Sequence, residues 1–154
     1  MSSFRRRLLE SIPKYIQFKD SNTKAICVAN WGSNGEITYT QAAAVTTIGD
    51  KFKGNTTITS FDELKYFTGL TSWSTAYYNT FYGCTSLTSV VFPKCSLTTI
   101  PSNSMNNCYA LKSVTIPEGY TFLGGTCMGE CSISDIVLPS TINTIEQTPF
   151  HENK

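Results

Sequence analysis

From residue 45 onward the sequence repeats itself with a period of 22 to 24 residues, and this repeat constrains the fold more than any other feature. Each unit opens with Phe or Met, has a Cys three residues later, continues with apolar residues at regular offsets and ends on Pro. The clearest units are Phe81-Cys84-Leu87-Val90-Phe92-Pro93, Met105-Cys108-Leu111-Val114-Ile116-Pro117 and, one residue shorter, Met128-Cys131-Ile133-Ile136-Leu138-Pro139. A unit this short cannot bury its apolar face alone, so neighbouring units must stack to form a core. The period therefore predicts a solenoid.

Two short strands are expected in each repeat. The spacing L-x-x-L-x-L, as at Leu87, Val90 and Phe92, is the strand signature of leucine-rich repeats, in which the apolar residues point inward. A second apolar pair precedes each following unit, at Leu70/Trp73, Leu97/Ile100, Tyr120/Leu123 and Ile142/Ile145. Strands stacked in this way should form parallel sheets. The expected fold is mainly β with short helices.

The repeat pattern begins upstream of its cysteines, in a modified first unit over residues 45–69. Asn55 takes the Cys position there, where a small side chain can meet otherwise unpaired backbone groups of the turn. The string Ser60-Phe61-Asp62-Glu63 matches an S-x-x-E capping box, and Gly69 stands where the residue after a helix belongs, so a short helix is expected. Later units span 70–96, 97–119, 120–141 and a partial last unit with Asn153 in the Cys position.

Residues 18–44 are expected to form a helix, a tight turn and a second helix. Asp20 can cap the first helix, and Gln41-Ala42-Ala43-Ala44 begins the second. Between them Asn34-Gly35-Glu36-Ile37 falls in register with positions 5 to 8 of an EF-hand loop. The remaining ligand positions would then be Asn30, Gly32, Thr38 and Gln41, but Gly32 has no side chain and Gln41 lacks the carboxylate that calcium requires at the last position. A turn without metal is therefore preferred, and no cofactor is expected.

The six cysteines do not form a recognisable disulfide or zinc framework. Cys84, Cys108 and Cys131 hold one position in successive repeats and should form a buried column of reduced thiols, because strands stacked about 4.8 Å apart are poorly placed for bridging. His151 is the single histidine and there is no C-x-x-C pair, so zinc is not indicated. The other cysteines, in a helical pattern and in turns, are Cys27, Cys95 and Cys127.

Charge and hydropathy exclude several classes of function. Twelve Lys and Arg against eleven Asp and Glu give a net charge of +1, so no basic field indicates nucleic-acid binding. No stretch is long and apolar enough to cross a membrane. The N-terminal segment begins like a signal peptide, but Glu10 and Pro13 interrupt it and no small-x-small cleavage site follows, so export by the common route is not expected.

The sequence resembles BspA-type leucine-rich-repeat proteins of gut anaerobes. The resemblance is carried by residues 81–93 and 111–117, and by 34–35, 42–45 and 60–68, which look like a degenerate EF-hand-like helical cap fused before such repeats. The opening Phe4-Arg5-Arg6-Arg7-Leu8-Leu9 resembles the start of short repeat proteins of Bacteroidales and their phages. The resemblance implies an accessory subunit of a larger particle such as a phage virion, or alternatively a cell-surface or extracellular adhesin that binds host glycan or matrix.

Candidate binding residues lie in an insertion and in an arm. Three extra residues lengthen the repeat that begins at Leu70, and insertions in repeat proteins loop out on one face. The insertion and neighbouring turns hold Tyr77, Tyr78, Tyr82 and Tyr109, which offer rigid contact surface or, alternatively, pack between repeats. The arm, residues 1–17, could touch an anionic surface, dock on a partner as an amphipathic helix, or stay disordered. Its anchor residues are Phe4, Arg5, Arg6, Arg7, Leu8 and Leu9.

The outward strand positions form a small, hydroxyl-rich face that suits a polar ligand or a flat protein partner, or is simply solvated. They are Thr88, Ser89, Val91, Lys112, Ser113, Thr115, Ser134, Asp135 and Val137. Catalysis is not expected, because the sequence has no G-x-S-x-G, no P-loop and no paired acids on a rigid element. The expected organisation is an arm over 1–17, a helical cap over 18–44 and repeats over 45–154, with protein partners or a glycan as ligand.

Overall fold

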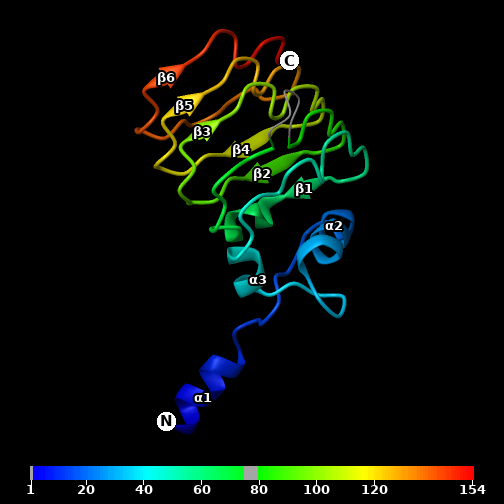
Figure 1. The fold of residues 1–154 in the computed structure, drawn as a ribbon, viewed down its shortest axis with the longest axis vertical. Coiled ribbons are helices and arrows are strands. Elements are labelled where there is room, and N and C mark those ends of the chain that lie inside the picture. The colour runs from blue at the N-terminus through cyan, green and yellow to red at the C-terminus, as the bar shows by residue number, and fades with distance from the viewer. Residues whose placement is uncertain (1, 75–79) are drawn as a thin grey trace.

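The computed structural model describes residues 2–74 and 80–154, so Tyr77 and Tyr78 lie outside the described residues. Three helices come first in the chain: α1 (Ser3–Glu10), α2 (Ser21–Trp31) and α3 (Tyr39–Ala43). Short strands and one 3-10 helix, η1 (Asp62–Tyr66), follow. α1 projects from one end of the long axis and the C-terminus lies near the other end (Figure 1).

Successive repeats contribute one strand each to two parallel sheets of the described chain. The first sheet consists of β1 (Ser60–Phe61), β2 (Ser89–Val91) and β4 (Ser113–Thr115), and the second of β3 (Thr99–Ile100), β5 (Phe122–Leu123) and β6 (Thr144–Ile145). Phe61 pairs with Val90 and Val90 with Val114, so equivalent positions of neighbouring repeats stand side by side. The parallel pairing predicted from the repeat is confirmed.

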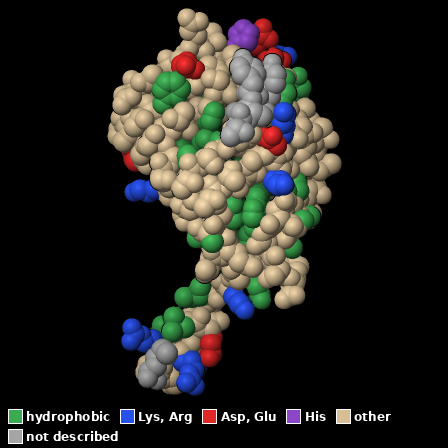
Figure 2. Space-filling view, in the orientation of Figure 1, with side chains coloured by type: hydrophobic (Ala, Val, Ile, Leu, Met, Phe, Trp, Pro, Cys, Tyr) green, Lys and Arg blue, Asp and Glu red, His purple; other side chains and the backbone are tan. Residues whose placement is uncertain are grey.

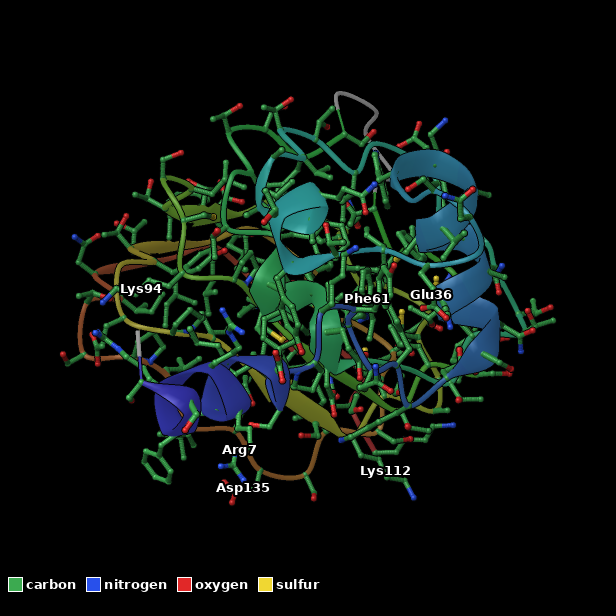
Figure 3. All side chains as sticks on the ribbon, turned by 90° about the horizontal axis from the view of Figure 1, so that it is seen from below. Arg7, Glu36, Phe61, Lys94, Lys112 and Asp135 are labelled. Carbon is green, nitrogen blue, oxygen red and sulfur yellow. The ribbon has the colours of Figure 1, made fainter. Side chains whose placement is uncertain are left out.

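The apolar positions of the repeat form the core. Phe52, Phe61 and Phe81 are fully buried, with ring centroids 4.8 to 6.1 Å apart. Phe61 lies near the middle of the body when the molecule is viewed along its long axis (Figure 3). Cys27 and Ile37 belong to the same cluster. Residues 16–44 therefore share one continuous core with the repeats.

The Cys position ties each repeat to the one before it. The thiol of Cys84 donates to the carbonyl oxygen of Phe52 at 3.0 Å, and the thiol of Cys108 donates to Phe81 at 3.0 Å. In the last unit Asn153 makes the equivalent hydrogen bond, because its Nδ2 donates to the Met128 carbonyl oxygen at 2.6 Å. All six cysteines are free thiols. One small donor per turn therefore links successive turns through their backbone.

The strand predicted over residues 133–138 does not form. Only one residue separates Cys131 from Ile133, where two separate Cys108 from Leu111. The backbone N–H of Ile133 donates to Oδ1 of Asn153 at 3.0 Å, so the segment is held by the last turn instead of a strand ladder. Val137 is 84% exposed in consequence. The first sheet ends at β4.

The capping box predicted at residues 60–63 is wrong, although a short helix does follow. Ser60 belongs to β1, and η1 begins at Asp62 without a side-chain cap. Glu63 is only 4% exposed, and its Oε1 accepts the backbone N–H of Lys19 at 3.1 Å. Gly69 does not terminate the helix in a left-handed conformation either. A Cβ there would lie 2.1 Å from the Ala43 carbonyl oxygen, so the glycine permits close packing on α3.

The two helices before the repeats form as predicted, with a shift at the second. Asp20 caps α2, accepting N–H groups of Asn22 and Thr23. α3 begins at Tyr39, two residues before the predicted start, because Thr38 and Gln41 form a reciprocal capping box. Residues that would be calcium ligands in an EF-hand loop thus satisfy the end of a helix.

The N-terminal segment covers the outer edge of β1. Oδ2 of Asp20 accepts the N–H of Thr59 at 3.1 Å, and the hydroxyl of Thr23 donates to the Ser60 carbonyl at 2.8 Å. These hydrogen bonds replace the backbone hydrogen bonds that another strand, placed before β1 in the sheet, would make. One end of the first sheet is therefore closed by side chains of α2 and the residue that caps it.

Candidate functional site

The predicted anchor residues lie together on α1, and no residue of this helix is buried. The Ser2 hydroxyl caps it by accepting the N–H of Arg5 at 3.3 Å. Phe4, Leu8 and Leu9 are 71%, 53% and 54% exposed. The helix thus carries large apolar side chains that nothing in the described chain covers.

Phe4 and Leu8 form an apolar stripe along α1, with an arginine on each side of it. Phe4 and Leu8 are one turn apart and form a stripe, and Ile12, just beyond the end of the helix, is also exposed. At steps of about 100° per residue, Arg5 and Arg7 flank this stripe and Arg6 lies on the opposite side of the helix. Arg7 points away from the body (Figure 3). Figure 2 shows basic and apolar side chains gathered at this end of the molecule. An isolated helix shorter than about 12 residues is marginal in water, so burial of the stripe on a partner would stabilise it.

The tyrosine candidates have different surroundings. Tyr109 is 53% exposed and lines a hollow of about 210 Å³ together with Glu130, Ser132, Glu152 and Lys154. Tyr82, in the preceding repeat, is half-buried, and its hydroxyl accepts from Nδ2 of Asn107 at 3.1 Å. Of the predicted tyrosines that the structure describes, only Tyr109 offers an open ring beside charged groups.

The hydroxyl-rich face is narrower than predicted. The hydroxyl of Thr88 donates to the Thr59 carbonyl at 2.7 Å, and Ser86 makes the same bond to Thr56 at 2.7 Å. These groups stabilise the stack of repeats. Since residues 133–138 form no strand, Ser134, Asp135 and Val137 do not continue the face. Thr88, Lys112, Ser113 and Thr115 remain as its exposed residues.

An acidic end that the sequence reasoning missed lies opposite α1. Residues 113–154 contain five carboxylates and one Lys, a net charge of −4; the carboxylates are Glu118, Glu130, Asp135, Glu146 and Glu152. Hydrogen bonds from the backbone and hydroxyl groups of Ser140 and Thr141 hold the pKa of Glu118 below its usual value. The net charge of the whole chain is near zero, so it does not reveal that negative charge is concentrated at this end. Counting charges by repeat would have found it.

A shallow hollow lies beside β6 at the same end. It measures about 420 Å³ and is lined by Gly125, Ile145, Glu146 and Gln147. Oε2 of Glu146 accepts the N–H of Gly125 at 2.7 Å and is fixed in place by it. Ile145 is 51% exposed, although the equivalent residues of the two preceding repeats, Ile100 and Leu123, are fully buried. The hollow thus combines an exposed apolar side chain with a carboxylate.

Two of the buried cysteine thiols are held in their protonated form. Burial raises the pKa of the Cys127 and Cys131 thiols to about 12, which disfavours the reactive thiolate. In residues 2–74 and 80–154, no group of three or more His, Cys, Asp or Glu side chains is placed to hold a metal ion. None of the helices in this part of the chain could span a membrane.

The parallel stacking of short units with an extended outer surface defines a repeat protein of the binding class. A family model described as BspA type leucine-rich repeat region, in six copies, matches residues 34–154. The chain belongs to this family of leucine-rich-repeat proteins. The match begins at residue 34, within the segment predicted as a separate cap. Neither a curated protein nor a solved structure matches the chain.

Proposed function

We propose that this chain is a non-enzymatic subunit of a larger assembly, in which α1 attaches the protein and the repeats form a solenoid that presents a binding surface. The observation that carries this proposal is α1 itself. It has a basic, apolar surface without any buried residue, and it projects from a body whose core begins only at Ile16. A body that is complete without α1 leaves this helix available for a partner.

The surface that would be presented is the turn region around Tyr109. Its hollow has carboxylates from Glu130 and Glu152, an ammonium group from Lys154 and a half-exposed aromatic ring. An aromatic ring among polar groups suits a protein loop or the face of a sugar. The helical segment over residues 18–44 acts in this proposal as a cap that closes the repeats at their N-terminal side.

The larger assembly fits a phage particle, given the resemblance of residues 4–9 to short repeat proteins of Bacteroidales and their phages. The protein would then be particle-associated. The alternative is a cell-surface or extracellular adhesin, which the exposed ring of Tyr109 favours because aromatic rings stack on sugars. In both cases the raised pKa values of the buried thiols support a role without catalysis.

Particle association is tested by expressing the full chain and a chain without residues 1–12 in the source organism and separating particles on a density gradient. We expect the full chain in the particle fraction and the truncated chain in the free fraction, with equal melting temperatures. A full chain that is found only free, or a truncated chain that stays with the particles, contradicts the proposal.

Charge-reversal variants give a matched control for this experiment. Arg5→Glu, Arg6→Glu and Arg7→Glu together should release the protein from the particle. The same change of charge at the exposed Lys51, Lys53 and Lys94 should not. For the adhesin alternative, binding to immobilised host glycans that Tyr109→Ala abolishes and deletion of residues 1–12 leaves intact would replace the particle hypothesis.

A further inference from the structure

The two ends of this molecule have opposite charge. Residues 1–19 contain Arg5, Arg6, Arg7, Lys14 and Lys19 against Glu10, a net charge of +4, whereas residues 113–154 carry −4. Among the described residues, no Lys or Arg forms an ion pair within the acidic end, where the only contact of this kind joins Glu152 to the imidazole of His151, and α1 contributes to no ion pair. Figure 2 shows mostly Lys and Arg among the charged side chains at the end where α1 lies, and several Asp or Glu side chains near the opposite end.

The acidic end also has an incomplete strand edge. The N–H groups of Thr144 and Glu146 donate to Thr121 at 3.1 Å and to Leu123 at 2.9 Å. Peptide groups alternate sides along a strand, so the N–H and C=O of Ile145 point away from β5. They lie next to the hollow of Ile145, Glu146 and Gln147, where a carboxylate and an apolar side chain are both accessible. This edge has acceptors for a guanidinium and surface for an apolar side chain.

We propose that the partner of α1 is a second copy of this chain, and that α1 docks with its Phe4–Leu8 stripe in the hollow beside β6 of that copy. Arg7 lies next to this stripe and meets Glu146 of the partner copy. The inference rests on the proposed function, because it names what the attaching helix binds. The charges of the two surfaces are complementary, and each surface has an exposed apolar residue that the other would cover.

This contact is heterologous, because it joins different surfaces of the two copies. At the other end of the stack, the edge strand of the first sheet, β1, is closed by Asp20 and Thr23, so two copies cannot pair edge to edge through β1. A heterologous contact continues from copy to copy and gives rings or open chains instead of a closed symmetric dimer. Its small area predicts weak, concentration-dependent association.

Two variants test the contact by complementation. The helix variant carries Phe4→Ser and Arg7→Glu, which leave the hollow intact. The hollow variant carries Ile145→Ser and Gln147→Lys, which leave α1 intact. All four side chains are exposed, so both variants should fold with unchanged circular dichroism and melting temperature. A control variant, Ser134→Lys with Val137→Ser, makes the same changes of charge and apolar surface at exposed positions of the unit 120–141, outside the hollow.

Sedimentation velocity from about 1 to about 300 µM, the range of weak association, gives the readout. We expect the wild-type protein and the control variant to form species larger than dimers, and each test variant alone to associate at least tenfold more weakly. Mixing the two test variants should give a one-to-one pair and nothing larger, since one intact helix meets one intact hollow. A wild-type protein that stays monomeric, or a mixture that does not pair, overturns the inference.

The outcome is distinguishable from failure of the proposed function. If the hollow variant still enters the particle fraction while the helix variant does not, α1 attaches the protein to a different molecule and only the self-docking is wrong. A monomeric wild-type protein that binds vesicles containing phosphatidylserine through α1 would show that the helix recognises an anionic membrane, which also overturns the inference.

Discussion

Replacing Cys84 with alanine tests whether the buried thiol stabilises the stack of repeats. The sulfur is fully buried and contributes about 0.8 kcal/mol, the value for one buried methylene-sized group. A residual cavity of roughly 25 Å³ adds about 0.6 kcal/mol. The bond from Sγ to the Phe52 carbonyl adds about 0.5 kcal/mol, because a thiol is a weak donor and that carbonyl keeps the Asn55 N–H.

Cys84→Ala should therefore lower the free energy of unfolding by about 2 kcal/mol, and the melting temperature by about 4 to 8 °C for a chain of this size. Cys84→Ser should cost about 1 kcal/mol, since its hydroxyl can still donate, and should leave binding unchanged. Urea unfolding under reducing conditions measures both. The control is Cys95→Ala, at a half-buried thiol, with a cost under about 0.5 kcal/mol. Equal stability of Cys84→Ala and wild type, or equal costs at both cysteines, would refute the role of the column.

Three further predictions concern the helices and their junction with the repeats. Gly69→Ala should lower the free energy of unfolding by more than about 2 kcal/mol in a urea titration, because its Cβ meets backbone of Ala43, whereas Gly49→Ala, with open space around it, should cost about 1 kcal/mol. Burial alone would raise the pKa of Asp20, but hydrogen bonds from Thr23, Thr59 and Asn22 outweigh it and lower the pKa. The folded state therefore favours the ionised form, and this stabilisation is complete above about pH 4 and lost as the pH falls through the lowered value. Stability measured against pH should fall less steeply in acid for Asp20→Ala, which should also cost about 2 kcal/mol at pH 7; an unchanged acid limb would contradict the cap. Millimolar calcium should leave the melting temperature unchanged, because the Gln41 side chain serves the helix cap, and a clear rise would restore the EF-hand interpretation.

The repeat period predicted most of the fold because each offset is a physical requirement. Val90 and Val114 have to point inward for their units to share a core, and a small donor has to follow Phe81 or Met105 by three residues to reach the previous turn. The same constraints apply in every unit, so the sequence provides repeated evidence for each of them. A single missing residue, between Cys131 and Ile133, was enough to remove a strand that the pattern alone still predicted.

Local motifs were less informative where distant segments compete for the same groups. The string at residues 60–63 has the composition of a capping box, but Lys19 supplies a backbone donor to Glu63 and Ser60 pairs with β2. Nothing in the four residues distinguishes these outcomes. Conversely, the capping box that does form at Thr38 and Gln41 was masked by its agreement with a calcium-loop register.

The candidate site was predictable in its residues and not in its geometry. The exposed anchor residues of α1 could be named from composition, since residues 4–9 are three consecutive arginines between a Phe and two Leu residues. The sequence does not show that these residues lie on a helix outside the core, opposite the acidic end. Their position depends on where the stack of repeats begins and ends in space. Tyr109 and Tyr82 looked equivalent in the sequence, yet one is open and the other is held by Asn107.

The most direct test of the account is amide hydrogen exchange of the full chain, measured in dilute solution and within its assembly. The account predicts that residues 3–10 exchange at nearly unprotected rates in dilute solution and become protected in the assembly, whereas the strands of the repeats are protected in both. Exchange of α1 that does not change on assembly would contradict the claim that this helix attaches the protein to its partner.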